Sequence, residues 1–177
     1  MKDPILGIIG GGQLGSLLSV AAKRIGIKTV ILSDDKNAPA KNFTEKFIFG
    51  NYDNKSITQE FIDSVDLVTY EFENIPFSIL QSINNEKTVL PKPEINSLIQ
   101  NRLTEKNFLN DINIQTTQYI SIKHIDELRE NENFLPGLLK TTTLGYDGKG
   151  QYKLNSLIDI NEDIDFTKEY ILEKLIN

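Results

Sequence analysis

The residues best suited to chemistry in this sequence are a lysine and the polar loop that follows it. Lys140 ends an apolar run, residues 135–140, and residues 141–150 are rich in threonine and glycine. A lysine at the end of a strand can place its ammonium against a phosphate while its stem packs on the sheet. The hydroxyls and backbone N–H groups of the loop could cover the same phosphate. The segment therefore favours a phosphate site, although Asp147-Gly148 also fits a plain β-hairpin turn.

A second group of candidate residues lies near the start of the chain. The sequence Gly10-Gly11-Gly12-Gln13-Leu14-Gly15 follows an apolar run and satisfies the pattern G-x-G-x-x-G, in which a helix N-terminus can bind an anion. Asp34 and Asp35 follow about twenty residues later, where a dinucleotide-binding fold places its ribose-binding acid. The pattern leaves open nucleotide binding, binding of another anion, and glycines needed only for close packing.

Three carboxylates also occur in positions that suggest ligand binding. Glu71 and Glu73 come directly after the buried run 66–70, and they would point the same way if the strand continued. They could accept hydrogen bonds from hydroxyl or amino groups, or simply form a solvated acidic loop. Glu173 interrupts the apolar run 170–176, where a carboxylate is costly without a partner. It could recognise a ribose hydroxyl or a base amino group, or it could face water on an edge strand.

The elements that position these residues alternate between strand and helix patterns. Strand, turn, helix and strand within the first forty residues predict a doubly wound parallel sheet, whose polar turns meet at one edge. Ser56 is expected near the cap of its helix, and Thr104 is a possible cap. We expect strands over residues 5–9, 28–32, 46–50, 66–70, 88–90, 116–122, 135–140, 151–154 and 170–176, and helices over residues 13–25, 56–63, 76–83, 94–101, 104–110 and 124–131.

Composition excludes several classes of function. The 177 residues carry a net charge of −6, which argues against nucleic-acid binding. The chain has no cysteine, so disulfides, thiolate metal sites and cysteine nucleophiles are excluded, and the one histidine, His124, is expected on a helix surface without a catalytic role. No run approaches the ~18 apolar residues of a membrane span, and the N-terminus does not read as a signal peptide. We therefore expect a cytoplasmic protein.

Four segments occur in order across almost the whole chain. They are Gly10-Gly11-Gly12-Gln13-Leu14-Gly15, Tyr70-Glu71-Phe72-Glu73-Asn74, Asn101-Arg102-Leu103-Thr104-Glu105-Lys106 and Lys140-Thr141-Thr142-Thr143-Leu144-Gly145-Tyr146-Asp147-Gly148-Lys149-Gly150-Gln151. Through these segments the chain resembles the N5-carboxyaminoimidazole ribonucleotide synthases of the ATP-grasp superfamily. The resemblance implies an α/β fold in which residues 1–100 form a doubly wound parallel sheet, the pre-ATP-grasp domain, and residues 101–177 form the first, incomplete part of an ATP-grasp α+β domain.

The resemblance also implies an activity, the ATP-dependent carboxylation of 5-aminoimidazole ribonucleotide by bicarbonate in purine biosynthesis, with magnesium as a further cofactor. It implies small-molecule substrates, no nucleic acid or membrane partner, and a possible homodimer. No catalytic residue follows from it, and the magnesium ligands are expected beyond residue 177. By resemblance, ATP would contact Arg102, Lys140, Gly145, Tyr146, Asp147, Gly148, Lys149, Gly150, Gln151, Glu173, Lys174, Leu175 and Ile176. The ribonucleotide substrate would contact Gly12, Gln13, Leu14, Glu71, Glu73, Tyr146 and Lys149.

Two features depart from the family pattern. Ser16 stands where the family usually has arginine, which removes one cation. By resemblance, residues 173–176 match the hinge strand that holds adenine. The chain stops there, so we expect a fragment that lacks the metal-binding half and has no ligase activity by itself. The alternatives are an NAD-dependent oxidoreductase domain built on the glycine bend and a non-catalytic nucleotide-binding remnant.

Overall fold

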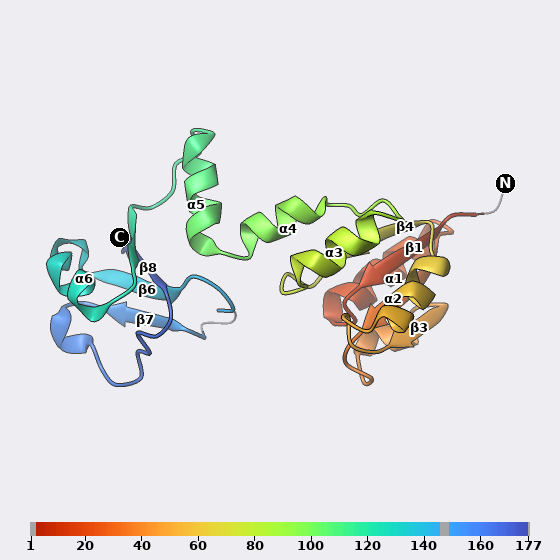
Figure 1. The fold of residues 1–177 in the computed structure, drawn as a ribbon, viewed down its shortest axis with the longest axis horizontal. Helices are drawn as coiled ribbons and strands as arrows, with labels where there is room; N and C mark the ends of the chain where they lie inside the picture. Colours follow the sequence, from red (N-terminus) through yellow and green to blue (C-terminus); the bar gives the residue numbers. More distant parts are fainter. Residues whose placement is uncertain (1–2, 146–148, 177) are drawn as a thin grey trace. The chain divides into compact units, whose positions relative to one another are not determined.

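The structure, a computed structural model, describes residues 3–145 and 149–176. Contacts within the chain divide it into two compact units, Met1–Ser97 and Leu98–Asn177 (Figure 1). Among the helices of the described residues, none combines the length and the apolar character that crossing a membrane requires.

A parallel four-stranded sheet forms the centre of the first unit. Its strands are β1 (Ile5–Ile9), β2 (Lys28–Ser33), β3 (Lys46–Phe49) and β4 (Leu67–Tyr70), in the order β3-β2-β1-β4. Ile9 pairs with Leu32 on one side and with Tyr70 on the other, so the carboxyl ends of the three strands are level. The turns that follow these strands therefore meet at one edge, which confirms the expected doubly wound arrangement.

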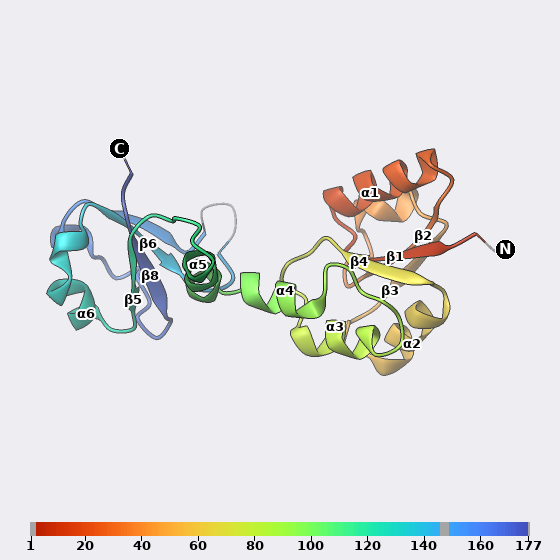
Figure 2. The same ribbon diagram turned by 90° about the horizontal axis from the view of Figure 1, so that it is seen from above.

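Helices cover both faces of this sheet. The helices are α1 (Gln13–Arg24), α2 (Lys55–Asp63) and α3 (Phe77–Asn84), and Figure 2 shows α1 on one face and α2 and α3 on the other. Side chains alternate along a strand, so Ile8 joins the core beneath α1 while Ile9 joins the core beneath α2 and α3. Both are fully buried, and each such side chain contributes ~1.5–3 kcal/mol of hydrophobic stabilisation.

Asparagine caps two helices, so Ser56 lies near its cap as expected, whereas the cap expected at Thr104 is wrong. The Asn54 side chain accepts hydrogen bonds from the amides of Ser56 and Ile57, so α2 begins at Lys55. Asn101 likewise caps α5 (Arg102–Asp111), whereas the Thr104 hydroxyl donates to the carbonyl groups of Leu98 and Asn101. An asparagine two or three residues upstream reaches the first free amides, so Ser56 and Thr104 both lie inside their helices.

Two expected strands are shorter than their patterns. The run 88–90 forms only an isolated bridge between Val68 and Val89, because Pro91 has no N–H with which to continue the pairing. In the second unit, β5 (Tyr119–Ile122) starts three residues later than expected. Thr117 donates its hydroxyl to the Lys174 carbonyl instead of joining the strand.

The second unit contains an antiparallel sheet, in the order β5-β8-β6-β7. Its other strands are β6 (Gly137–Thr141), β7 (Gln151–Leu154) and β8 (Tyr170–Lys174), and its helices are α6 (Ile125–Glu130) and α5; α4 (Pro93–Ile99) precedes α5 in the chain. Leu139 and Leu172 pair and face an apolar core that includes Leu128 of α6. Their neighbours Lys140 and Glu173 therefore lie on the opposite face.

Candidate functional site

The glycine bend of the first unit is held by a carboxylate of the chain itself. Gly10, Gly11 and Gly12 connect β1 to α1, and the Gly12 N–H donates to Glu71 Oε1 at 2.9 Å. Gly12 is the N-cap residue of α1 and has no side chain that could accept from the first turn of the helix. Glu71 accepts instead from the N–H of the N-cap residue itself. A carboxylate is also favourable there because the helix N-terminus carries partial positive charge.

This contact corrects the expectation for Glu71 and Glu73. The strand does not continue: β4 ends at Tyr70 and the chain turns at Glu73, so the two carboxylates do not share a direction. Glu71 is half-buried against the bend and is not a solvated loop residue, whereas Glu73 is exposed. Because the Gly12 amide is bonded to Glu71, it is not available to a dinucleotide pyrophosphate, which argues against the NAD alternative.

A pocket of about 230 Å³ lies beside the bend, at the carboxyl edge of the sheet. Among the described residues, its lining includes the carboxylates of Asp34, Asp35 and Glu71 but no lysine or arginine. Tyr52 is buried there and donates to Asp34 Oδ1 at 3.2 Å. Burial, and after it the negative charge of Asp34, raise the pKa of Tyr52 well above its usual value, so the phenol remains a donor. The pocket suits hydroxyl or amino groups better than a phosphate.

The other residues expected at the bend are not among those that line this pocket. Gln13 and Leu14 open α1 and are exposed. Ser16, which replaces the arginine of the family pattern, is buried, and its hydroxyl donates to the Gly12 carbonyl at 3.0 Å. The same carbonyl accepts the Ser16 N–H at 3.1 Å, so the hydroxyl adds a second bond within the first turn of α1.

In the second unit, Lys140 and Glu173 form an ion pair on one face of the sheet. Leu138 pairs with Glu173 and Lys140 with Ile171, so Lys140 is the diagonal neighbour of Glu173. Lys140 Nζ lies 2.8 Å from Glu173 Oε2. The alternative of an edge strand with Glu173 in water is wrong, because β8 lies between β5 and β6 and Glu173 is buried. The partner that its burial requires comes from the chain itself.

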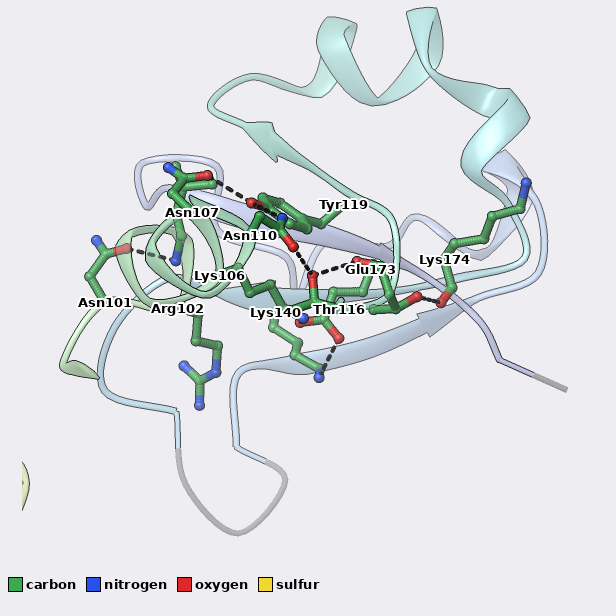
Figure 3. Close-up of polar contacts among 12 residues, drawn as sticks. Asn101, Arg102, Lys106, Asn107, Asn110, Thr116, Tyr119, Lys140, Glu173 and Lys174 are labelled. Carbon is green, nitrogen blue, oxygen red and sulfur yellow. Dashed lines mark hydrogen bonds and ion pairs between the residues drawn. The ribbon is translucent and has the colours of Figure 1, made fainter. Parts of the chain in front are cut away.

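A second lysine, which the sequence argument did not single out, contacts the same carboxylate. Lys106 of α5 places its Nζ 3.3 Å from Glu173 Oε1 (Figure 3). The signal that could have found it is its spacing: Lys106 follows Arg102 by four residues, so both lie on one side of the helix.

Arg102 anchors the start of the glycine–threonine loop. Its guanidinium donates to the carbonyl of Thr141 at 2.8 Å and to the carbonyl of Gly145. Its backbone N–H also donates to the Thr142 carbonyl at 2.8 Å. A guanidinium has five N–H donors, so these bonds do not exhaust it. The expected contact between Arg102 and phosphate stays a prediction.

The loop lies between two antiparallel strands, whereas the turn expected at Asp147-Gly148 falls outside the described residues. Lys140 pairs with Gln151 across β6 and β7, and the Thr141 N–H donates to the Gly150 carbonyl at 2.9 Å. The first part of the loop and Lys149 line a pocket of about 550 Å³ together with Asn101, Lys168 and Glu169. Tyr146, Asp147 and Gly148, which were expected to cover a nucleotide, lie outside the described residues.

The remaining expected nucleotide contacts follow β8. Lys174 ends the strand and is exposed, and the Leu175 N–H donates to the Pro136 carbonyl at 3.1 Å. Ile176 is exposed. Their assignment to adenine stays a prediction. Within residues 3–145 and 149–176, no group of three or more histidine, aspartate or glutamate side chains could hold a metal ion.

Comparison with known proteins gives matches over both units. Residues 1–100 match the family described as the ribonucleotide synthetase preATP-grasp domain, and residues 107–177 match the ATP-grasp domain. The N5-carboxyaminoimidazole ribonucleotide synthase of Brucella melitensis is 40% identical over 154 residues, which cover 86% of this chain and 42% of the relative. The chain thus spans less than half the length of this curated relative.

Solved structures agree with this assignment. N5-carboxyaminoimidazole synthetase from Staphylococcus aureus, complexed with ADP, is 32% identical with a TM-score of 0.92, over all of this chain and 49% of that one. N5-carboxyaminoimidazole synthase from Aspergillus clavatus, in complex with ADP and 5-aminoimidazole ribonucleotide, is 25% identical with a TM-score of 0.85, over 98% of this chain and 46% of that one.

Proposed function

Because the chain belongs to the family of ribonucleotide synthetase preATP-grasp domains, with an ATP-grasp segment after it, we propose that it serves the synthesis of N5-carboxyaminoimidazole ribonucleotide. The reaction is the ATP-dependent carboxylation of 5-aminoimidazole ribonucleotide by bicarbonate. We place the substrate-side domain at residues 1–100 and the nucleotide-binding domain at residues 101–177.

This proposal rests on two cations of the second unit, Lys140 at the end of β6 and Arg102 at the start of α5. Lys140 lies directly before a loop with hydroxyl and backbone donors, and Arg102 is bonded to the same loop. Lysine, arginine and backbone N–H groups together are what a polyphosphate requires. The residues present therefore fit the phosphates of ATP, with Lys140, Arg102 and the loop as their ligands and the end of β8 beside the base. The ADP-bound relative supports this reading.

The acid-lined pocket of the first unit is proposed as the ribonucleotide side. Carboxylates accept hydrogen bonds from hydroxyl and amino groups, and the aminoimidazole ribonucleotide offers both. Glu71 and the Gly12 region border that pocket, with Gln13 and Leu14 exposed on the adjoining helical turn. The substrate phosphate would need a cation from elsewhere, because no lysine or arginine lines the described part of this pocket.

Each group of residues has a distinct part in this chemistry. When bound, ATP supplies the phosphoryl group that activates bicarbonate. Lys140 and Arg102 would hold negative charge in place, and fixed cations of this kind stabilise the charge that develops as a phosphoryl group moves. The glycine–threonine loop would keep water from the reacting groups. The described residues lack a cluster of side chains that could hold a metal ion.

Replacing Lys140 by methionine tests the nucleotide site, because methionine keeps an unbranched stem and removes the charge. We expect the affinity for ADP to fall about tenfold or more, since a hydrogen bond to a charged group contributes ~1.5–3 kcal/mol. Affinity is read from amide chemical shifts during titration to millimolar ADP. The shifts should concentrate in β6, β7 and β8. Lys153→Met, which removes an exposed lysine from the same sheet, is the control.

The same spectra separate the two proposed sites. The ribonucleotide substrate should shift the amides of Gly12, Gln13 and Glu71 and leave β8 unchanged. If ADP or NAD shifted the amide signals of the glycine bend instead, the assignment of the two sites would be overturned. Equal ADP affinity in the Lys140 and Lys153 variants would remove Lys140 from the phosphate site.

A further inference from the structure

Lys106 is largely buried, and it has no role in the nucleotide site proposed above. Its Nζ lies 3.3 Å from Glu173 Oε1 and 5.5 Å from the centroid of the Tyr119 ring. The side chains of Lys106, Lys140 and Glu173 are 16%, 19% and 10% exposed. A lysine held so far from water requires a specific partner, and Glu173 supplies it.

A set of hydrogen bonds fixes this part of α5 against β5. The Asn110 side-chain amide donates to the Tyr119 hydroxyl at 2.9 Å, and that hydroxyl donates to Asn107 Oδ1 at 2.8 Å (Figure 3). Tyr119 in turn pairs with Glu173 across β5 and β8. These bonds hold α5, which contains Lys106, against β5, and β5 pairs with β8, the strand that contains Glu173.

The charges of the cluster do not balance. Two ammonium groups share one carboxylate, each at a different oxygen: Lys106 at Oε1 and Lys140 at Oε2. If Lys106 were absent, the single negative charge of Glu173 would balance the single positive charge of Lys140. With Lys106 present, part of the negative charge of Glu173 is already compensated. The Lys140 ammonium is then attracted more strongly to a further anion than it would be in a neutral pair with Glu173.

We propose that Lys106 is a positioning residue for the nucleotide phosphates: it holds one oxygen of Glu173 and thereby leaves the Lys140 ammonium able to bind phosphate. This inference rests on the proposed nucleotide site of the second unit. It concerns phosphate recognition alone, because Lys106 acts through Glu173 and Lys140 and not through the base.

Two ligands distinguish this role from a structural one. In Lys106→Met, we expect the affinity for ADP to fall about tenfold, the effect of losing one charged contact. The affinity for adenosine, which has no phosphate, should change less than about twofold, an amount within ordinary side-chain effects. Lys106→Arg keeps the charge and can still contact both Glu173 and Tyr119, so it should restore ADP binding. Lys153→Met again controls for the loss of one positive charge.

A measurement without nucleotide tests the same arrangement independently. The rate at which an N-hydroxysuccinimide acetate reagent acetylates Lys140 is followed by peptide mass spectrometry. Lys140 should react several-fold more slowly in Lys106→Met, because its ammonium then no longer shares Glu173 with a second lysine and is held more firmly in the ion pair. Lys106→Arg should react as the unaltered chain does.

The outcomes are separable. Equal losses of ADP and adenosine binding without rescue by arginine would show that Lys106 only supports the fold. An unchanged acetylation rate in Lys106→Met would overturn the shared-carboxylate arrangement. If the unaltered chain bound no ADP, the proposed function would fail, while slower acetylation of Lys140 in Lys106→Met would still support the arrangement of the three charges.

Discussion

Replacing Glu173 by leucine is expected to destabilise the second unit by about 2–4 kcal/mol, because Lys106 and Lys140 then lose the carboxylate that both contact. This loss of stability is somewhat smaller than the loss from breaking a fully buried ion pair, since both lysines keep some access to water. Urea unfolding, followed through the amide signals of β8, measures the change. For a unit of this size, each kcal/mol lowers the melting temperature by ~4–8 °C.

An exposed ion pair of the same unit provides the matched control. Asp126 contacts Arg129 at 2.9 Å, but the two side chains are 76% and 58% exposed. Asp126→Asn should therefore change stability by less than ~0.5 kcal/mol. If Glu173→Leu cost no more than Asp126→Asn, water would already surround the two lysines in solution, and the charge cluster would not exist as described.

The parallel sheet of the first unit could be predicted from sequence because its physical signal is local. A strand buried on both faces is an uninterrupted apolar run, and the run that forms β1 has this pattern before a glycine turn. Gly26 after α1 has a φ of +79°, as expected for a residue that ends a helix in the left-handed region. Each of these features depends on a few consecutive residues.

The candidate site could be predicted only in part, because its contacts join distant segments. The direction of Glu71 depends on where β4 stops and on the space that the glycine bend leaves, and neither follows from alternation along one strand. The role of Lys106 depends on α5 lying against β8, a tertiary contact that helix periodicity does not contain. The burial of Glu173 was correctly judged to need a partner, but the sequence did not show that two lysines meet it.

Gly10→Ala should destabilise the first unit by ~3 kcal/mol or more, for two reasons. Gly10 has a φ of +109°, which side chains rarely adopt, and a Cβ there would lie 2.7 Å from Glu71 Oε1. Alanine would thus strain the backbone and push the carboxylate from the Gly12 amide. Urea unfolding, followed through the amide signals of β1, measures the effect.

Gly26 and Glu71 allow the two causes to be separated. Gly26→Ala meets no atom within 4 Å, so it reports the cost of a positive φ alone, ~1 kcal/mol. Glu71→Ala removes the obstacle, and in that background Gly10→Ala should cost little more than Gly26→Ala does. Strict additivity of the Gly10 and Glu71 substitutions would contradict this account, because residues that compete for one space must show an interaction energy. Gly10 leaves the space that the Glu71 carboxylate occupies when it accepts from the Gly12 amide. The stability effect of substituting either Gly10 or Glu71 therefore depends on which residue is present at the other position.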